Sequence, residues 1–273
     1  MGLSVQTDVS AMNIVRNMKI HENNMNSNLE QLSSGYKINS AADDAAGLAI
    51  SEKLKGQLTG LEQAELNVQD AVSLLQTAEG GMNTVHNILN RMVELTTKAS
   101  NGIYDSTVDR EAIQSELNSL NEEINRISNS VNFNNKKLLD GSFNSIQFQI
   151  GSEESDTLFV TIGSINIKAL GLDAIDVSSP EKALESLQIV KDAINSVSKE
   201  RANVGVTQNR LEYTLSNLEE TYANLSEANS RIRDVDYAKV MMEYTKNQLL
   251  HQVSVTMLSH RMSNAQNILQ LFR

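Results

Sequence analysis

The sequence of 273 residues contains no cysteine, no tryptophan and a single proline, Pro180. Without cysteine the chain can form neither a disulfide framework nor a thiolate nucleophile. Aromatic residues make up 4% of the chain, whereas hydrophobic residues make up 40%, so aliphatic side chains, methionine and alanine must fill the core. A proline inside a helix costs about 3 kcal/mol, and its near absence permits long unbroken helices. These absences favour helices packed side by side.

Basic charge and long apolar runs are also scarce. The formal net charge is −11, which argues against a nucleic-acid partner because phosphates require a basic face. No segment has the roughly 18 continuous apolar residues of a membrane span. The N-terminus MGLSVQTDVS lacks the basic flank and apolar run of a signal peptide. We therefore expect no nucleic acid and no membrane as partners, and either a cytosolic protein or one exported without a cleaved signal.

Heptad periodicity is the strongest positive signal. Apolar residues recur alternately three and four residues apart in 61–92, in 113–131 and in 181–232, and this spacing predicts coiled-coil helices. In the last segment, polar residues interrupt the pattern at Arg201, Gln208 and Asn229. Ser178 or Ser179 is the expected N-cap of that helix, with Pro180 in its first turn. The sequence predicts a mainly α fold, a long antiparallel coiled-coil bundle with a small β-hairpin insert.

The two chain ends carry amphipathic stripes of their own, and each stripe needs a partner helix in the same chain or in another. The N-terminal stripe is Ala11, Val15, Met18, Met25, Leu29 and Leu32. The C-terminal stripe runs from Tyr237 through Met241, Tyr244, Gln248, His251, Val255, Leu258, Met262, Ala265 and Leu269 to Phe272. We expect the terminal helices to form a coiled-coil domain together.

The period changes only in the middle of the chain. Apolar and polar residues alternate in 146–150 and 158–162, and Ile165 and Ile167 continue the alternation, which predicts short strands. Polar turns are expected at 151–157 and 163–164. A small β region therefore interrupts the helices at about 143–170.

Motifs of enzymes and metal sites are missing from the sequence. His21-Glu22 begins like a zinc-protease motif, but Met25 stands where the second histidine is needed. No phosphate-binding loop and no GxSxG motif occur. The pair Asp43-Asp44 could bind a cation, but a capping box from Ser40 to Asp43 at a helix start is the preferred interpretation. We expect no enzyme activity, no cofactor and no metal.

Long stretches of the sequence resemble bacterial flagellins. Near the N-terminus these are LEQLSSGYKINSAADDAAGLAISEKLKGQ, DAVSLLQTAEGGMNTVHNILNRMVEL and NFNNKKLLDGSF. Near the C-terminus they are NRLEYTLSNL, ANSRIRDVDYAKVMMEYTKNQLL and ILQLFR. The resemblance covers about 1–143 and 180–273, and the length of the chain resembles that of short flagellins without large outer domains.

The resemblance implies a structural subunit that is exported unfolded through the flagellar type III export apparatus and polymerises with itself into the extracellular filament. It implies that 1–45 and 233–273 form an inner core domain. The helices 46–142, the small β region 143–179 and the long helix 180–232 would form an outer core domain. Its implied partners are a C-terminus-directed export chaperone and the hook-associated and cap proteins.

Three groups of site residues follow from the resemblance. Residues 32–51 would be a spoke between the two domains, with Gly35, Asp43, Asp44 and Gly47 as its key members. The stripe expected to drive assembly comprises Val15, Met18, Val255, Leu258, Met262 and Leu269. The candidate surface for a host Toll-like receptor comprises Arg91, Glu94, Leu95 and Glu116, although Asn90 and Val93 depart from the family's Gln-Arg-x-Arg-Glu-Leu pattern.

Two other interpretations remain open at this point. A hook–filament junction protein shares the terminal architecture, but its termini diverge from the motifs quoted above. A coiled-coil scaffold protein would explain the heptads but not the terminal motifs.

Overall fold

The computed structural model describes the backbone of residues 8–105 and 108–271, and the side chains of these residues up to residue 267. The chain divides into two compact units. We call Met1–Leu58 with Ala223–Arg273 the terminal unit, and Thr59–Tyr222 the central unit. Two long helices, α2 (Ala45–Ala99) and α5 (Pro180–Arg233), contribute residues to both units.

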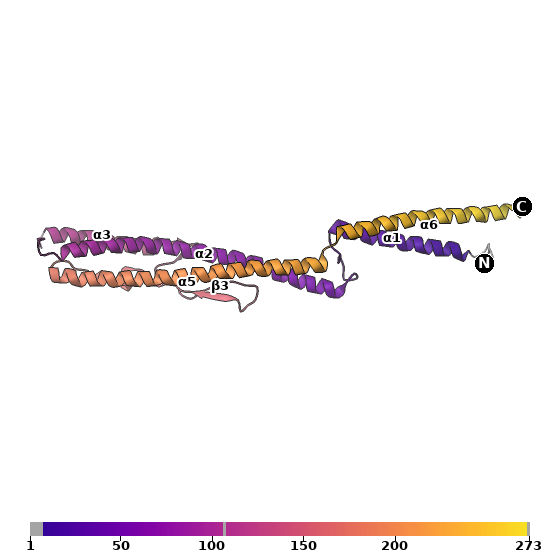
Figure 1. Cartoon of the computed structure of the whole chain (residues 1–273). Coiled ribbons are helices and arrows are strands. Elements are labelled where there is room, and N and C mark those ends of the chain that lie inside the picture. The colour runs from indigo at the N-terminus through magenta and orange to yellow at the C-terminus, as the bar shows by residue number, and fades with distance from the viewer. Residues whose placement is uncertain (1–7, 106–107, 272–273) are drawn as a thin grey trace. The chain divides into compact units, whose positions relative to one another are not determined.

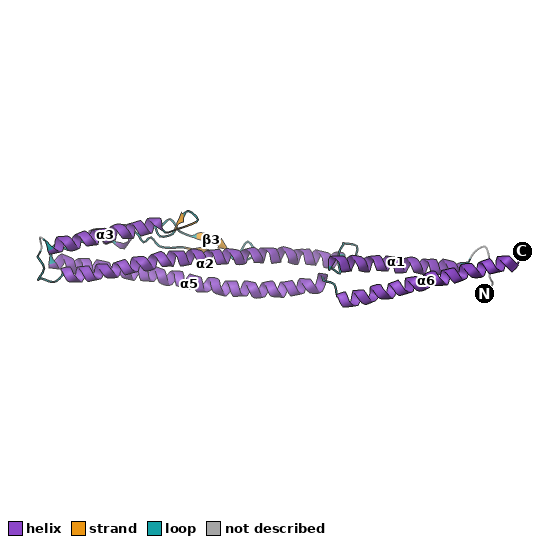
Figure 2. Cartoon of the chain, turned by 90° about the horizontal axis from the view of Figure 1, so that it is seen from above, coloured by secondary structure: helices purple, strands orange, loops and turns teal. Residues whose placement is uncertain are grey.

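In the central unit, α2, α3 (Asp109–Ser130) and α5 run alongside one another (Figures 1 and 2). The heptad positions predicted in 61–92 are all buried, from Leu61 at 7% exposure to Met92 at 0%. In α5 every second seam position is deeply buried, as at Val190, Val197 and Leu211. The polar seam residue Arg201 reaches back to α2, where its Nη2 lies 3.5 Å from Oε1 of Glu79. The predicted mainly α coiled-coil bundle is thus confirmed.

The start of α5 follows the predicted capping signals. The helix begins at Pro180, the carbonyl of Ser179 accepts a hydrogen bond from the amide of Ala183 (2.9 Å), and the Ser179 hydroxyl accepts one from the amide of Lys182 (3.3 Å). Ser179 is therefore the cap, and a proline in the first turn loses no helical hydrogen bond because its missing amide hydrogen has no partner there.

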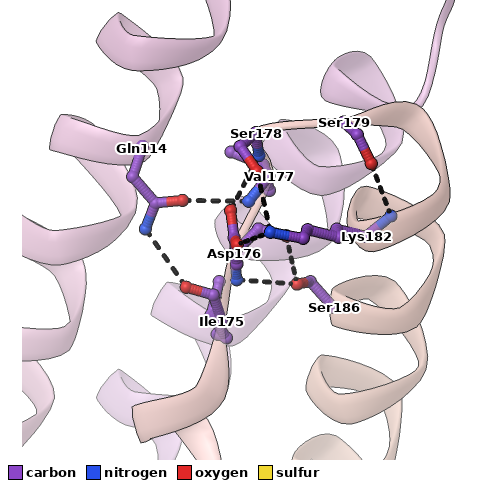
Figure 3. A network of polar contacts seen from close by, with 8 residues as sticks. All are labelled: Gln114, Ile175, Asp176, Val177, Ser178, Ser179, Lys182 and Ser186. Carbon is purple, nitrogen blue, oxygen red and sulfur yellow. Dashed lines mark hydrogen bonds and ion pairs between the residues drawn. The ribbon is translucent and has the colours of Figure 1, made fainter.

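A polar network anchors the same helix start to α3 (Figure 3). Lys182 Nζ lies 2.6 Å from Oδ2 of Asp176, and the Ser186 hydroxyl exchanges two hydrogen bonds with the Asp176 backbone (2.8 and 3.0 Å). Gln114 of α3 bonds the backbone on either side of Asp176: its side-chain amide donates to the carbonyl of Ile175 and accepts from the amide of Val177. The hydrogen bond from Lys182 is the main cause that lowers the pKa of Asp176 to about 2.

The region between α3 and α5 contains two small hairpins. β3 (Ile146–Gln149) pairs antiparallel with β4 (Thr157–Val160), which confirms the expected hairpin. β1 (Asn132–Phe133) pairs with β2 (Lys136–Lys137), and the sequence analysis missed this hairpin. Its signal was the dipeptide Asn134-Asn135, since both residues have a positive φ (47° and 63°), as a type I′ turn requires.

The predicted continuation of strand structure through Ile165 and Ile167 is wrong. Residues Ile167–Leu170 form the short helix α4, and Leu172–Ala174 form the 3-10 helix η1. The side chain of Asn166 caps α4 by accepting a hydrogen bond from the amide of Ala169 (2.8 Å). An asparagine at the N-cap position therefore outweighed the two-residue alternation.

In the terminal unit, α1 (Val9–Ser34) packs against α6 (Tyr237–Leu271). Asp8 caps α1 by accepting hydrogen bonds from the amides of Ser10 and Ala11 (3.0 and 3.1 Å). At the other end, Gly35 adopts a left-handed conformation (φ 77°), and its amide donates to the carbonyl of Gln31. The helix pair thus has a defined beginning and end on the α1 side.

Candidate functional site

The contact between α1 and α6 is rich in polar residues. His21 of α1 lies with Nδ1 3.2 Å from Oδ1 of Asn247, and Arg261 lies 3.9 Å from Asp8. These two contacts show that the helices run antiparallel. Asn28 of α1 is 8% exposed, and its Nδ2 has no partner among the described residues. A seam built this way gains less from hydrophobic burial than an aliphatic heptad seam.

Large apolar residues instead cover the outer surface of the pair. On α1 they include Met12 at 64% and Leu29 at 55% exposure. On α6 they include Met242 at 67%, Leu249 at 58% and Val253 at 54%. A monomer rarely exposes so many apolar side chains along two adjoining helices, and such a surface marks a contact with another molecule.

The predicted assembly stripe is divided between the seam and this outer surface. Val15, Val255 and Met262 are exposed, whereas Met18 and Leu258 are half-buried. The side chain of Leu269 and residue Phe272 lie outside the described residues. On α6 the predicted stripe positions Tyr244, His251 and Leu258 are half-buried. Gln248, Val255 and Met262 are exposed, and the residues before them, Asn247, Ser254 and Arg261, are half-buried instead.

The predicted spoke pairs with the segment that precedes α6. The amide of Lys37 donates to the carbonyl of Arg233 (2.7 Å), and the amide of Val235 donates to the carbonyl of Gly35 (3.0 Å). Between these bonds Tyr36 and Asp234 form an antiparallel bridge. The two connecting segments, 35–37 and 233–235, therefore hold each other as a minimal sheet within the terminal unit.

Arg233 completes this joint with its side chain. Its guanidinium stacks 4.7 Å above the ring of Tyr36 and places Nη1 2.6 Å from Oε1 of Glu52 and 3.4 Å from the hydroxyl of Ser51. The Arg233 side chain is 16% exposed, whereas that of its ion-pair partner Glu52 is 52% exposed, so the arginine is largely covered and the carboxylate stays in contact with solvent. Arg233, Tyr36 and Glu52 were not among the predicted site residues, although all three lie in the quoted motifs. The long separation between Glu52 and Arg233 in the sequence hides their contact.

The spoke's acidic pair accepts hydrogen bonds from its own neighbours in the chain. Asp44 caps the helix by accepting a hydrogen bond from the amide of Gly47 (2.9 Å), while Asp43 accepts hydrogen bonds from the amide and hydroxyl of Ser40. The backbone hydrogen bond from Ser40 is the largest cause that lowers the pKa of Asp43. The helix begins at Ala45, so the predicted capping box at Ser40 was placed too early.

Gly47 is buried, and a side chain there would collide with its surroundings. A Cβ atom would lie 2.5 Å from Oδ2 of Asp44 and 2.8 Å from Cδ1 of Ile38. Ile38 is itself 3% exposed and plugs the space that the glycine leaves. Gly47 therefore serves close packing at the start of α2.

The candidate receptor surface brings together three of its four predicted residues. Arg91 of α2 pairs with Glu94 through Nη1 and with Glu116 of α3 through Nη2, both at 2.9 Å. The pKa of Arg91 is raised, and the hydrogen bond to Glu94 is its largest cause. Leu95 is 4% exposed, so it supports this surface from beneath and offers little to a partner. The four residues line a shared hollow together with Lys98 and Tyr104, among others.

The described residues contain neither a metal-binding cluster nor a membrane-spanning helix. No cluster of three or more histidine, cysteine, aspartate or glutamate side chains arranged to hold a metal occurs between residues 8–105 and 108–271. No helix in that part of the chain combines the length and the apolar character needed to cross a bilayer.

Comparison with known families agrees with the geometry of both units. The model of the bacterial flagellin N-terminal helical region matches residues 5–144, and that of the C-terminal helical region matches 187–272. The chain belongs to the bacterial flagellin family. The resemblance found in the sequence motifs is confirmed, and it extends through both terminal helices of the family member described here.

Individual relatives match almost end to end. Flagellin from Bacillus subtilis (strain 168) is 40% identical and covers 99% of this chain and 100% of its own length. Flagellin from Halalkalibacterium halodurans is 42% identical, with 98% and 99% covered. The flagellar filament 30.7 kDa core protein of Treponema maltophilum is 40% identical, again with 98% and 99% covered.

Solved structures support the fold. The crystal structure of Bacillus cereus flagellin aligns with a TM-score of 0.50 at 30% identity and covers 56% of this chain and 88% of its own. A chain from Vibrio parahaemolyticus whose name places it among flagellar hook-associated proteins aligns with a TM-score of 0.61 at 16% identity, covering 70% and 100%. The second likeness shows a shared fold only. The hook–filament junction interpretation is therefore not favoured over the flagellin one.

Proposed function

We propose that this chain is a structural subunit that polymerises with itself into the bacterial flagellar filament. Its family is one of structural proteins and not of enzymes, and relatives such as the Treponema maltophilum protein are named filament core proteins. The observation that carries the proposal is the outer surface of the α1–α6 pair, where Met12, Val15, Leu249, Val253 and Met262 are each 44–64% exposed. Neighbouring copies of the same chain would cover this surface.

The two structural units suggest how the subunit is divided. In the proposal, 1–45 and 233–273 form the inner core domain, and 46–142, 143–179 and 180–232 form the outer core domain. The backbone bridge between 35–37 and 233–235 lies near both boundaries of the inner domain. A joint stabilised by backbone bonds and by Arg233 would keep the terminal pair's connections aligned during assembly.

The experiment that tests this function is polymerisation of the purified chain. We expect ammonium sulfate to convert the protein into long filaments of uniform diameter that negative-stain electron microscopy resolves and that sediment at high speed. The control is the same chain without residues 237–271, which lacks α6 and therefore the proposed assembly surface. Amorphous precipitate from the full chain, or filaments from the truncated one, would contradict the proposal.

The route to the filament is part of the same proposal. The chain would leave the cell through the flagellar type III export apparatus, after an export chaperone has covered its C-terminal helix, and would be inserted beneath cap proteins on a base of hook-associated proteins. The support is the exposed apolar surface of α6, which needs protection before assembly because such surfaces aggregate. Pull-down of the bacterium's own export chaperone by the full chain, and not by the chain without 237–271, is the expected result.

A second proposed role is recognition by a host Toll-like receptor. Arg91, Glu94 and Glu116 lie together on an exposed surface, which supports this role. Arg91→Ala removes the charge that links α2 to α3 on this surface. We expect the affinity for the receptor, measured as the response of a reporter cell, to fall at least about tenfold, because one charged contact worth about 1.4 kcal/mol is lost. The control is Arg126→Ala, which breaks an exposed pair with Glu123 elsewhere on α3. Equal responses to both variants would contradict this role.

A further inference from the structure

Methionine is distributed very unequally between the two units. The chain has ten methionines. The two in the central unit, Met82 and Met92, are both 0% exposed. By contrast, five on the α1–α6 pair are 50–67% exposed: Met12, Met241, Met242, Met257 and Met262. One chain therefore holds both protected thioethers and freely accessible ones.

The exposed methionines belong to the surface that the proposed function assigns to assembly. Met241 and Met242 line a shallow hollow on α6 together with Thr245, Lys246 and Leu249. The hollow faces away from the partner helix, since α6 meets α1 through residues such as Asn247. Unbranched methionine side chains suit a surface that must fit several neighbouring helices, because they adapt their shape at little cost.

We propose that these five exposed methionines form an oxidation site that controls whether a subunit can assemble. The oxidant is a hydroperoxide, with hydrogen peroxide as the simplest case. The thioether sulfur attacks one peroxide oxygen, an S–O bond forms and the O–O bond breaks. The sulfur loses two electrons, and the departing hydroxide takes the proton of the newly bound hydroxyl and leaves as water, so that the sulfoxide remains.

The product blocks assembly for a simple physical reason. Methionine sulfoxide replaces an apolar, flexible tip with a polar and chiral one, and burying it without hydrogen-bond partners is unfavourable. Met82 and Met92 escape because the central core excludes the oxidant. In an assembled filament, neighbouring copies exclude the oxidant from the terminal pair as well. Oxidation therefore keeps subunits with oxidised methionines out of the filament and spares the subunits already assembled.

The test compares oxidised and unoxidised full-length chain, and it rests on the proposed function. Monomers are treated with hydrogen peroxide, mapped by peptide mass spectrometry and then polymerised with ammonium sulfate. We expect one added oxygen at each of the five exposed methionines and none at Met82 or Met92. The critical concentration for assembly should rise at least about tenfold, equivalent to about 1.4 kcal/mol. Treatment with methionine sulfoxide reductases A and B should restore it.

The control variant carries leucine at all five positions (M12L, M241L, M242L, M257L and M262L). Leucine conserves volume and apolarity, so this variant should assemble with or without peroxide. Preformed wild-type filaments should resist oxidation at the same five sites.

Each outcome distinguishes the two levels of the argument. If oxidised wild-type chain polymerises normally, or if peroxide also disables the leucine variant, the oxidation site is refuted and the proposed function stands. If unoxidised wild-type chain does not polymerise at all, the proposed function fails and the oxidation site fails with it.

Discussion

The central and terminal units treat their apolar residues in opposite ways. In the central unit the seam residues Val190, Val197, Val204 and Leu211 of α5 are at most 2% exposed. Among the described residues of α1 and α6, Val240 is the only hydrophobic residue whose side chain is buried, at 7% exposure. Hydrophobic burial contributes about 25 cal/mol per Å² of apolar area, so the central unit gains its stability within one chain. In the proposed function the terminal pair makes that gain only through contacts with other copies.

The polar residues of the α1–α6 seam fit this division of roles. His21 with Asn247, and Arg261 with Asp8, are contacts that fix which helix meets which and in which register. Polar groups in a helical seam give specificity at a cost in stability. The helices α1 and α6 therefore pair in a defined register but weakly, and their outer apolar surface remains available for other contacts.

The largest expected effect comes from a charge on that outer surface. Val255→Asp places a carboxylate at a position that is 45% exposed in the monomer and that the proposed function buries in the filament. The unpaired charge should cost several kcal/mol, on the order of 3, per assembled subunit, and every subunit repeats it. We expect no sedimentable filaments under conditions that pellet the wild type, while the monomer keeps its helical circular dichroism.

A matched control uses the same substitution elsewhere. Val108, at the N-cap of α3, is 69% exposed, and an aspartate there suits the helix start. Val108→Asp should polymerise normally. Leu258→Asp is a less clear test, because Leu258 is half-buried and its replacement would also disturb the monomer. Filaments from Val255→Asp would show that this face of α6 is not an assembly surface.

The next largest effect is expected on the stability of the central unit. Leu211 is 0% exposed in the α5 seam, and Leu211→Ala should lower the free energy of unfolding by about 2–5 kcal/mol through lost burial and a residual cavity. Urea denaturation followed by circular dichroism measures it. Two residues away, Tyr213 is 79% exposed, and Tyr213→Ala should change the same free energy by less than about 0.5 kcal/mol. Similar losses for both variants would contradict a self-sufficient central core.

The same contrast explains how far the sequence could predict the structure. The seams of 61–92, 113–131 and 181–232 were predictable because their partners lie in the same chain and burial there imposes a strict period. The α6 stripe was predictable only in part: Tyr244, His251 and Leu258 are half-buried, whereas Val255 and Met262 are exposed. Ser254 and Arg261 are half-buried in place of these last two. In the proposed function the exposed apolar residues of α6 contact other copies, so their pattern does not reveal which side of α6 faces α1.

Contacts between distant segments were also beyond the sequence. The joint of Tyr36, Glu52 and Arg233 depends on a three-dimensional approach that no local pattern encodes. By contrast, the cap of α5 at Ser179 was readable to within one residue, because capping is a local hydrogen bond. The cap of α2 lies at Asp44, four residues after the predicted Ser40.

A smaller effect is expected at this joint. Arg233→Ala removes the stacking on Tyr36 and the ion pair with Glu52, together about 1–2 kcal/mol, and the loss is local. Hydrogen exchange of the amides of Lys37 and Val235 should accelerate about tenfold, because both donate across this bridge. Arg233→Lys keeps the charge but not the planar stacking, so its exchange should be intermediate. Unchanged exchange in Arg233→Ala would show that the backbone bridge needs no support from the side chain.

The smallest effect concerns the anchor of α5, where pH sharpens the comparison within the central unit. The folded-state pKa of Asp176 is lowered from 3.8 to about 2, chiefly by the hydrogen bond from Lys182. A lowered pKa stabilises the fold above the unfolded value, and this stabilisation is lost as the pH falls from about 4 to about 2. Because the pair is half-exposed (54% and 46%), we expect a contribution of at most about 1 kcal/mol.

Asp176→Asn should therefore lower the free energy of unfolding by up to about 1 kcal/mol at pH 7 and by almost nothing at pH 2. Urea titrations of both chains at these two pH values measure the difference. A loss of the same size at both would mean that the anchor depends on the geometry of the 175–177 backbone and Ser186 rather than on the carboxylate charge.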